Sequence, residues 1–161
     1  MPMPRMTLER TAPPRWLQLG ALCVALAMPA ALSAQLRVIA HPSYPESDIS
    51  VRDLGRLYRG EYSALVSGQR AVLAEQGPAR VRYVRTVTGM DDDQFRRHWI
   101  RIVFAGTPVQ PPRGFSDADA VCAFVARTPG AMAIVDGRCD GSVKTLSVNG
   151  KSVGDAQYPL R

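Results

Sequence analysis

The sequence contains few of the residues from which metal centres and nucleophilic active sites are built. It has two histidines, His41 and His98, and neither has cysteines or paired carboxylates at the spacing that metal ligands need. Neither histidine has the setting of a general base. No serine lies in a Gly-x-Ser-x-Gly motif, and none of the three cysteines has a catalytic signature. These absences predict a protein that is not an enzyme and that carries no metal or other cofactor.

The chain also lacks an apolar run long enough to cross a membrane. Its longest apolar run, Trp16–Met28, carries no charge and ends before Pro29, so it is shorter than the ~20 residues that a spanning helix requires. This run follows a basic lead, formed by Arg5, Arg10 and Arg15, and precedes the small residues of 29–34. The order basic, apolar, small is typical of a secretory signal peptide.

We therefore predict a leader over residues 1–34 and a periplasmic domain over residues 35–161. Cys23 lies inside the leader without the small residues that a lipidation site needs before it, so it is expected to be lost on cleavage. The remaining chain of roughly 127 residues is enough for one domain with a single core.

Acidic residues are outnumbered by basic ones, 14 against 20 over the whole sequence. The excess is mostly arginine and is spread along the chain, unlike the basic stripe of a nucleic-acid-binding protein. It suits either a small anionic ligand or a solvated surface, and no nucleic-acid partner is expected.

Two cysteines, Cys122 and Cys139, remain after removal of the leader. In an oxidising compartment an even pair favours a disulfide. The alternative is that both are small, buried, apolar residues.

Short β-branched segments alternate with amphipathic ones, and this predicts an α/β sandwich with a mostly parallel sheet.

Asp91-Asp92-Asp93 opens one helix, where the macrodipole favours carboxylates, so these residues are predicted to cap the helix and not to bind metal. The strands are expected at 36–40, 70–75, 131–135 and 143–148, and the helices are expected to begin at Ser50, Ala79, Asp91 and Ser116. The buried stripe of the third helix is expected to be Phe95, Trp99, Ile102 and Val103.

The junction between strand 70–75 and the following helix is the candidate binding element. Gln76-Gly77-Pro78 leads into a helix whose first-turn N–H groups and positive dipole end suit an oxyanion. Arg80 and Arg82 could add charge-assisted hydrogen bonds. The same pattern also fits an ordinary turn that is followed by a solvated basic face.

Several segments resemble, in order, the periplasmic phosphate-binding proteins of ABC transporters, particularly their short single-domain relatives. VARTPGAMAIV (125–135) is similar to the family pattern F-V-x-x-T-P-G-A-I-G-Y-V, and QFRRHWIRIVFAGTPVQPPR (94–113) to W-x-x-x-I-F-x-G-x-x-x-P-P-R. Three further segments match family patterns less specifically: ISVRDLGRLYRGEY, SDADAVCAFV and SVNGKSVGDAQYPLR. The resemblance covers residues 36–161.

This resemblance implies a periplasmic-binding-protein-like three-layer sandwich, reduced to about one small domain, and a solute-binding function. The sequence departs from the family at three places. Pro78 follows Gly77 where family members often have serine, Ala133-Ile134 replaces Gly-Tyr, and residues 41–46 replace a glycine-rich loop.

Two functional hypotheses remain open. In the first, the protein holds phosphate or a similar oxyanion and serves a membrane transporter. Its contacts would then be Ser43, Gly77, Ala79, Arg80 and Arg82, through side chains or backbone N–H groups. In the second, the same fold is an interaction module for a membrane or envelope partner and binds no small ligand.

The leader should be removed between about Ser33 and Gln35, because its charge, apolar length and small-residue end all agree. Mass spectrometry of the exported protein should give a mature N-terminus in this interval. Retention of residues 1–34 in the exported form would contradict the prediction.

Overall fold

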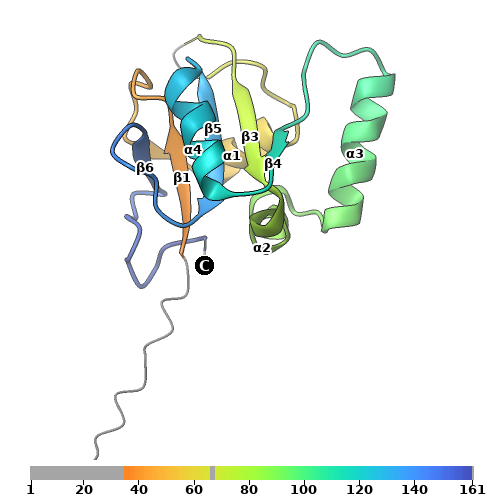
Figure 1. Cartoon of the computed structure of the whole chain (residues 1–161). Helices are drawn as coiled ribbons and strands as arrows, with labels where there is room; N and C mark the ends of the chain where they lie inside the picture. The colour runs from red at the N-terminus through yellow and green to blue at the C-terminus, as the bar shows by residue number, and fades with distance from the viewer. Residues whose placement is uncertain (1–34, 66–67, 161) are drawn as a thin grey trace, which may run out of the picture. The chain divides into compact units, whose positions relative to one another are not determined.

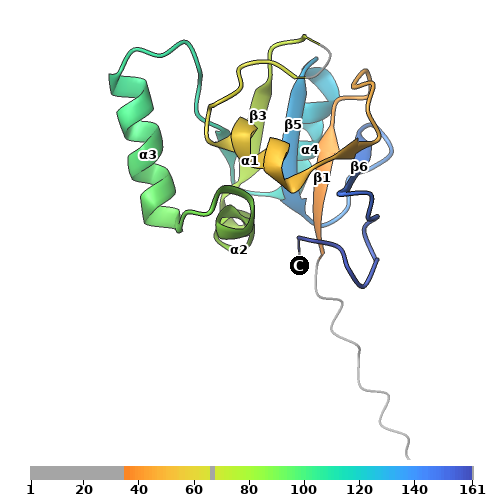
Figure 2. The same cartoon turned by 180° about the vertical axis from the view of Figure 1, so that it is seen from behind.

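The computed structural model describes residues 35–65 and 68–160, so the predicted leader lies outside the described residues. These residues form three layers, with α4 on one face of a six-stranded sheet and α1 and α2 on the other (Figures 1 and 2). The elements are β1 (Leu36–Ala40), β2 (Asp48–Ile49), α1 (Val51–Tyr58), β3 (Val72–Gln76), α2 (Gly77–Thr88), α3 (Asp92–Phe104), β4 (Arg113–Phe115), α4 (Ala118–Arg127), β5 (Ala131–Asp136) and β6 (Lys144–Val148).

The strands follow the order β2-β6-β1-β5-β3-β4. Three neighbouring pairs, β2–β6, β5–β3 and β3–β4, are parallel, which confirms the predicted α/β fold with a mostly parallel sheet. β1 is antiparallel to both of its neighbours, β5 and β6. As a result β1 runs opposite to β3, and the two strands end at opposite ends of the sheet.

The predicted strand after the Pro-Gly corner is confirmed as β5, which lies in the middle of the sheet. Its larger side chains, Met132 and Ile134, pack in the core under α1 and α2, whereas Ala131, Ala133 and Val135 pack against α4. All five are essentially inaccessible to solvent. This burial on both faces explains why the segment is an unbroken apolar run.

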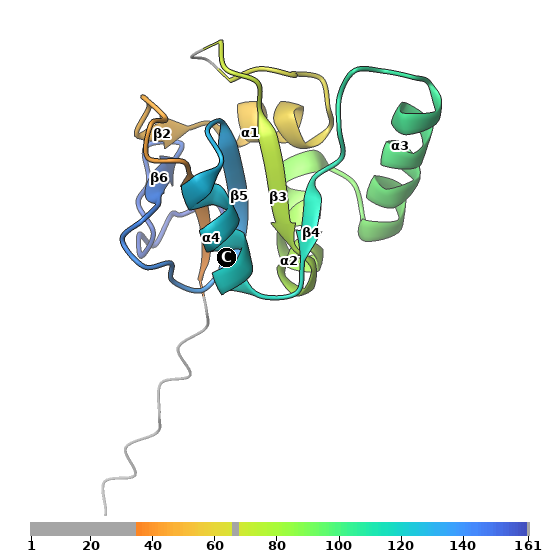
Figure 3. The same cartoon turned by 45° about the horizontal axis from the view of Figure 1, so that its top comes forward.

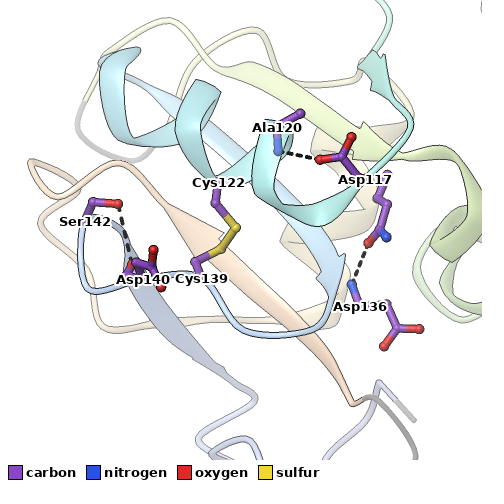
Figure 4. The surroundings of a disulfide bond; sticks show 8 residues. Asp117, Ala120, Cys122, Asp136, Cys139, Asp140 and Ser142 are labelled. Carbon is purple, nitrogen blue, oxygen red and sulfur yellow. Dashed lines mark hydrogen bonds between the residues drawn. A yellow bond between two sulfur atoms is a disulfide. The ribbon is translucent and has the colours of Figure 1, made fainter.

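The predicted disulfide is also confirmed. Cys122 on α4 is joined to Cys139 in the loop after β5, with Cα atoms 5.6 Å apart (Figure 4). Such a separation lies within the usual range for a bridge. In the chain-entropy model a loop of this size contributes about 3 kcal/mol to stability.

Side-chain caps begin three of the four described helices. Ser50 accepts the N–H of Asp53, and Asp91 and Gln94 form the predicted capping box. The cap of α4 is Asp117 and not the predicted Ser116, because the Asp117 carboxylate reaches the N–H of Ala120 at 2.8 Å while the Ser116 hydroxyl donates to Asp117.

Some predicted boundaries and burials are wrong. β3 covers residues 72–76, and α2 begins at Gly77 instead of Ala79. On α3, Phe95 and Trp99 are buried, but Ile102 is half-buried and Val103 is 52% exposed. The helix stands beyond α2, away from the middle of the sheet, so its second half has less of the protein to pack against (Figure 1).

Gly130→Ala should destabilise the protein by at least about 3 kcal/mol. Gly130 has φ +80°, and a Cβ atom there would lie 2.3 Å from the carbonyl oxygen of Arg70. Gly141→Ala is the matched control, because a Cβ atom at Gly141 meets nothing within 4 Å. Urea unfolding should show the large loss for the first variant alone; equal losses would contradict the prediction.

Candidate anion-binding site

The start of α2 differs from the starts of the other described helices. Gln76 occupies the N-cap position in extended conformation, but no side chain accepts the N–H groups of the first turn. The Gln76 amide oxygen instead accepts the N–H of Asp136, at 2.9 Å. Pro78 lies in this first turn and has no N–H to donate. The first turn therefore has N–H groups available to an acceptor, but one fewer than in an ordinary helix.

Arg80 lies one turn into α2 and is held between two carboxylates. Its Nη1 donates to Glu75 Oε1 at 2.5 Å, and its Nε donates to Asp92 Oδ1 at 2.6 Å. A longer bond of 3.4 Å joins Nη2 to Asp92 Oδ2. The hydrogen bond to Asp92 raises the pKa of Arg80 above its ordinary value. Arg80 thus ties β3, α2 and α3 together, and an added anion would compete with both carboxylates.

Glu75 is the buried member of this group. Its side chain is 8% exposed, and its Oε2 atom has no hydrogen-bond partner in the described part of the chain. Burial raises the pKa of the Glu75 carboxyl, while the charge of Arg80 opposes that shift. The ion pair with Arg80 therefore offsets much of the free-energy cost of burying the ionised Glu75 carboxylate.

Neither Arg82 nor Ala79 offers a free side chain to an anion, as a direct contact would require. Arg82 Nη1 forms an ion pair with Asp136, the last residue of β5, so it is not a freely offered cation. Ala79 is 1% exposed, and its side chain packs in the core under α2. Its contribution to a ligand would come through the backbone N–H.

The structure does not bring Ser43 together with the other four predicted residues. Ser43 follows the end of β1, where Ala40 is level with Met132, whereas Gly77 follows the end of β3, where Glu75 is level with Ile134 near the far end of β5. Figure 1 shows the loop after β1 and the start of α2 at opposite ends of the sheet. Ser43 Oγ lies 2.7 Å from His41 Nδ1. The five residues therefore do not form one site.

Sequence reasoning missed the carboxylates that hold the arginines. Asp92 and Asp136 come near α2 through the fold, from α3 and β5, and no spacing in the sequence links them to Arg80 or Arg82. Glu75 gave a local signal, since a charged residue within a buried strand is expected to have a partner.

Comparison with known proteins supports the fold. No family model matches the sequence, and no curated protein does. Among solved structures, a protein from Clostridium perfringens described as a phosphate ABC transporter substrate-binding protein with bound phosphate has a TM-score of 0.58 and 14% identity over 73% of this chain and 46% of that chain. PstS from Borrelia burgdorferi has a TM-score of 0.54 and 12% identity, over 73% and 48%.

An ABC-type phosphate transport receptor from Vibrio cholerae matches with a TM-score of 0.50 and 12% identity, over 73% of this chain and 47% of that chain. The likeness confirms the periplasmic-binding-protein-like fold. This chain spans about half the length of these neighbours.

Arg80→Ala should destabilise the protein more at pH 8 than at pH 4. The folded pKa of Glu75 is raised, so the ionised carboxylate costs stability as the pH rises above the ordinary value of 4.5. Removing Arg80 raises that pKa further. We expect a loss of about 3 kcal/mol at pH 8 and a much smaller one at pH 4 in urea unfolding.

The double variant Arg80→Ala/Glu75→Gln should recover most of the loss at pH 8, because it removes the buried charge. Arg52→Ala, an exposed arginine on α1, is the control and should stay within about 0.5 kcal/mol of the parent protein. An equal loss for Arg80→Ala at both pH values would show that Glu75 ionisation is not the cause.

Proposed function

We propose that this protein is a non-catalytic, extracytoplasmic solute-binding-like protein that binds phosphate or a similar small oxyanion weakly at the start of α2. The observation that carries the proposal is the helix start without a side-chain cap, placed after a strand in a fold shared with phosphate-binding proteins. Backbone N–H groups of Gly77, Ala79 and Arg80 would be its contacts, because helix N-termini favour anions.

The affinity should be low for two structural reasons. Pro78 removes a donor from the turn that faces the anion. Arg80 and Arg82 are already paired with carboxylates, so each anion contact would be made in competition with an existing ion pair. We expect a dissociation constant that is roughly micromolar or weaker.

The proposed location is the periplasm, reached by a cleaved signal peptide. The Cys122–Cys139 disulfide supports a location outside the cytoplasm, because such bridges persist in oxidising compartments. A membrane transporter would then be the natural recipient of the solute.

A second candidate function, an interaction module for an envelope protein, is favoured by one surface. Ile100, Val103 and Phe104 on α3 are 55%, 52% and 87% exposed. Arg97 and Arg101 flank them on the same helix. A partner that presents apolar side chains beside carboxylates would complement this surface.

Calorimetric titration with phosphate and sulfate, combined with substitutions of Pro78, tests the anion site. Pro78→Ser restores both the N–H and a hydroxyl, and should tighten phosphate binding roughly tenfold. Pro78→Ala restores the N–H alone and should give a smaller gain. Pro78 is exposed, so both variants should fold.

The role of Arg80 is tested in the Arg80→Ala/Glu75→Gln variant, which should bind phosphate more weakly than the parent, while Arg52→Ala should bind equally. Nanomolar affinity in the parent, or no response to Pro78→Ser, would overturn the placement at α2. No heat with either anion in any variant would leave the interaction module as the function.

A further inference from the structure

A second feature with binding chemistry lies at the other end of the sheet, at the amino end of β3. β4 begins at Arg113, level with Ala74, so within the described residues no strand pairs with Val72 and Leu73 on that side. The segment that joins α3 to β4 arches past this place (Figure 3). A cavity of about 150 Å³ remains between β3, α1, α3 and this segment.

The interior of this cavity is mainly apolar. Leu57, Leu73, Trp99 and Val109 contribute to its lining. Trp99 is fixed in place because its Nε1 donates to the carbonyl oxygen of Tyr58 at 3.1 Å. Gly60 gives the ring room, since a Cβ atom there would lie 2.9 Å from Trp99 Cη2. The Trp99 ring is therefore a preformed part of the lining.

Two arginines, Arg70 and Arg113, also line the cavity, and both are exposed. No carboxylate of residues 35–65 and 68–160 forms an ion pair with either of them. The guanidinium of Arg113 lies over the rings of Phe115 and Phe124, 5.7 and 5.3 Å from their centroids, and these contacts orient it. The cavity thus combines an apolar interior with unpaired positive charge, in contrast to the paired Arg80 at the start of α2.

We propose that this cavity binds a small organic monocarboxylate, with its apolar body beside Trp99 and its carboxylate at Arg70 and Arg113. Cavities of about this volume hold a single six-membered ring. An arginine guanidinium matches a carboxylate with two parallel hydrogen bonds. An apolar site with a few polar groups that fix orientation is the usual form of a small-ligand pocket. The site shares no residue with the start of α2.

The full chain should be titrated calorimetrically with sodium benzoate, with benzamide as the neutral analogue and with acetate as the carboxylate without a ring. Benzoate should bind with a dissociation constant of roughly 0.1–1 mM, and benzamide and acetate at least about tenfold more weakly. The Trp99 indole N–H resonance, assigned through Trp99→Phe, should shift with benzoate and not with phosphate.

Arg70→Ala and Arg113→Ala should each weaken benzoate binding at least about fivefold, because each removes a charged hydrogen-bond donor. Arg52→Ala should leave it unchanged, and Pro78→Ser should alter phosphate binding alone. The proposal is overturned by equal binding of benzoate and benzamide, by unchanged benzoate affinity in the Arg70→Ala/Arg113→Ala double variant, or by the absence of benzoate binding at 10 mM. If phosphate binding did not respond to Pro78→Ser, only the function proposed for the start of α2 would be overturned.

Discussion

The described structure depends on the burial of β5 between two strands of opposite direction. β5 begins at a Pro-Gly corner that only a residue without a side chain can form, because Gly130 lies against the carbonyl oxygen of Arg70. It then pairs antiparallel with β1 and parallel with β3. Small side chains toward α4 and larger ones toward α1 and α2 set the spacing of the two outer layers. The disulfide holds the α4 side of this arrangement in place.

The two candidate binding features, the start of α2 and the cavity beside β3, lie at opposite ends of the sheet. At the end where α2 starts, arginines are neutralised by carboxylates, and helix N–H groups are what remains for an anion. At the other end, Arg70 and Arg113 have no carboxylate in the described residues and stand beside an apolar cavity. An anion whose binding free energy comes mainly from charge would therefore compete with these carboxylates for the arginines at the α2 end. An anion with an apolar body could in addition gain binding free energy by burying that body in the cavity at the other end.

Local signals in the sequence were sufficient for much of the fold. The cap at Asp91, the Pro-Gly corner and the unbroken apolar run of β5 each act within a few residues, and each was predicted correctly. The errors concern properties set by distant neighbours. Val103 has the spacing of a buried residue, but the second half of α3 has little to pack against. Likewise, β1 runs antiparallel to its neighbours and this separates Ser43 from Gly77, but neither the sequence around Ser43 nor that around Gly77 indicates the direction of the strand.

The candidate site was less predictable than the fold, because a binding site depends on which charges remain unpaired. Arg80 was identified as a candidate contact from its place after a strand–glycine–helix junction, and the structure places it on α2 directly after β3, while its contact with a ligand stays a prediction. Its pairing was only partly a local property: Glu75 lies five residues before it, at the end of β3, whereas Asp92 reaches it from α3. Arg113 shows the converse: its sequence context is a proline-rich connection, yet the fold sets it over two aromatic rings beside a cavity. A guanidinium held in this way has already lost part of its side-chain freedom, so a carboxylate that binds it meets a smaller entropic cost.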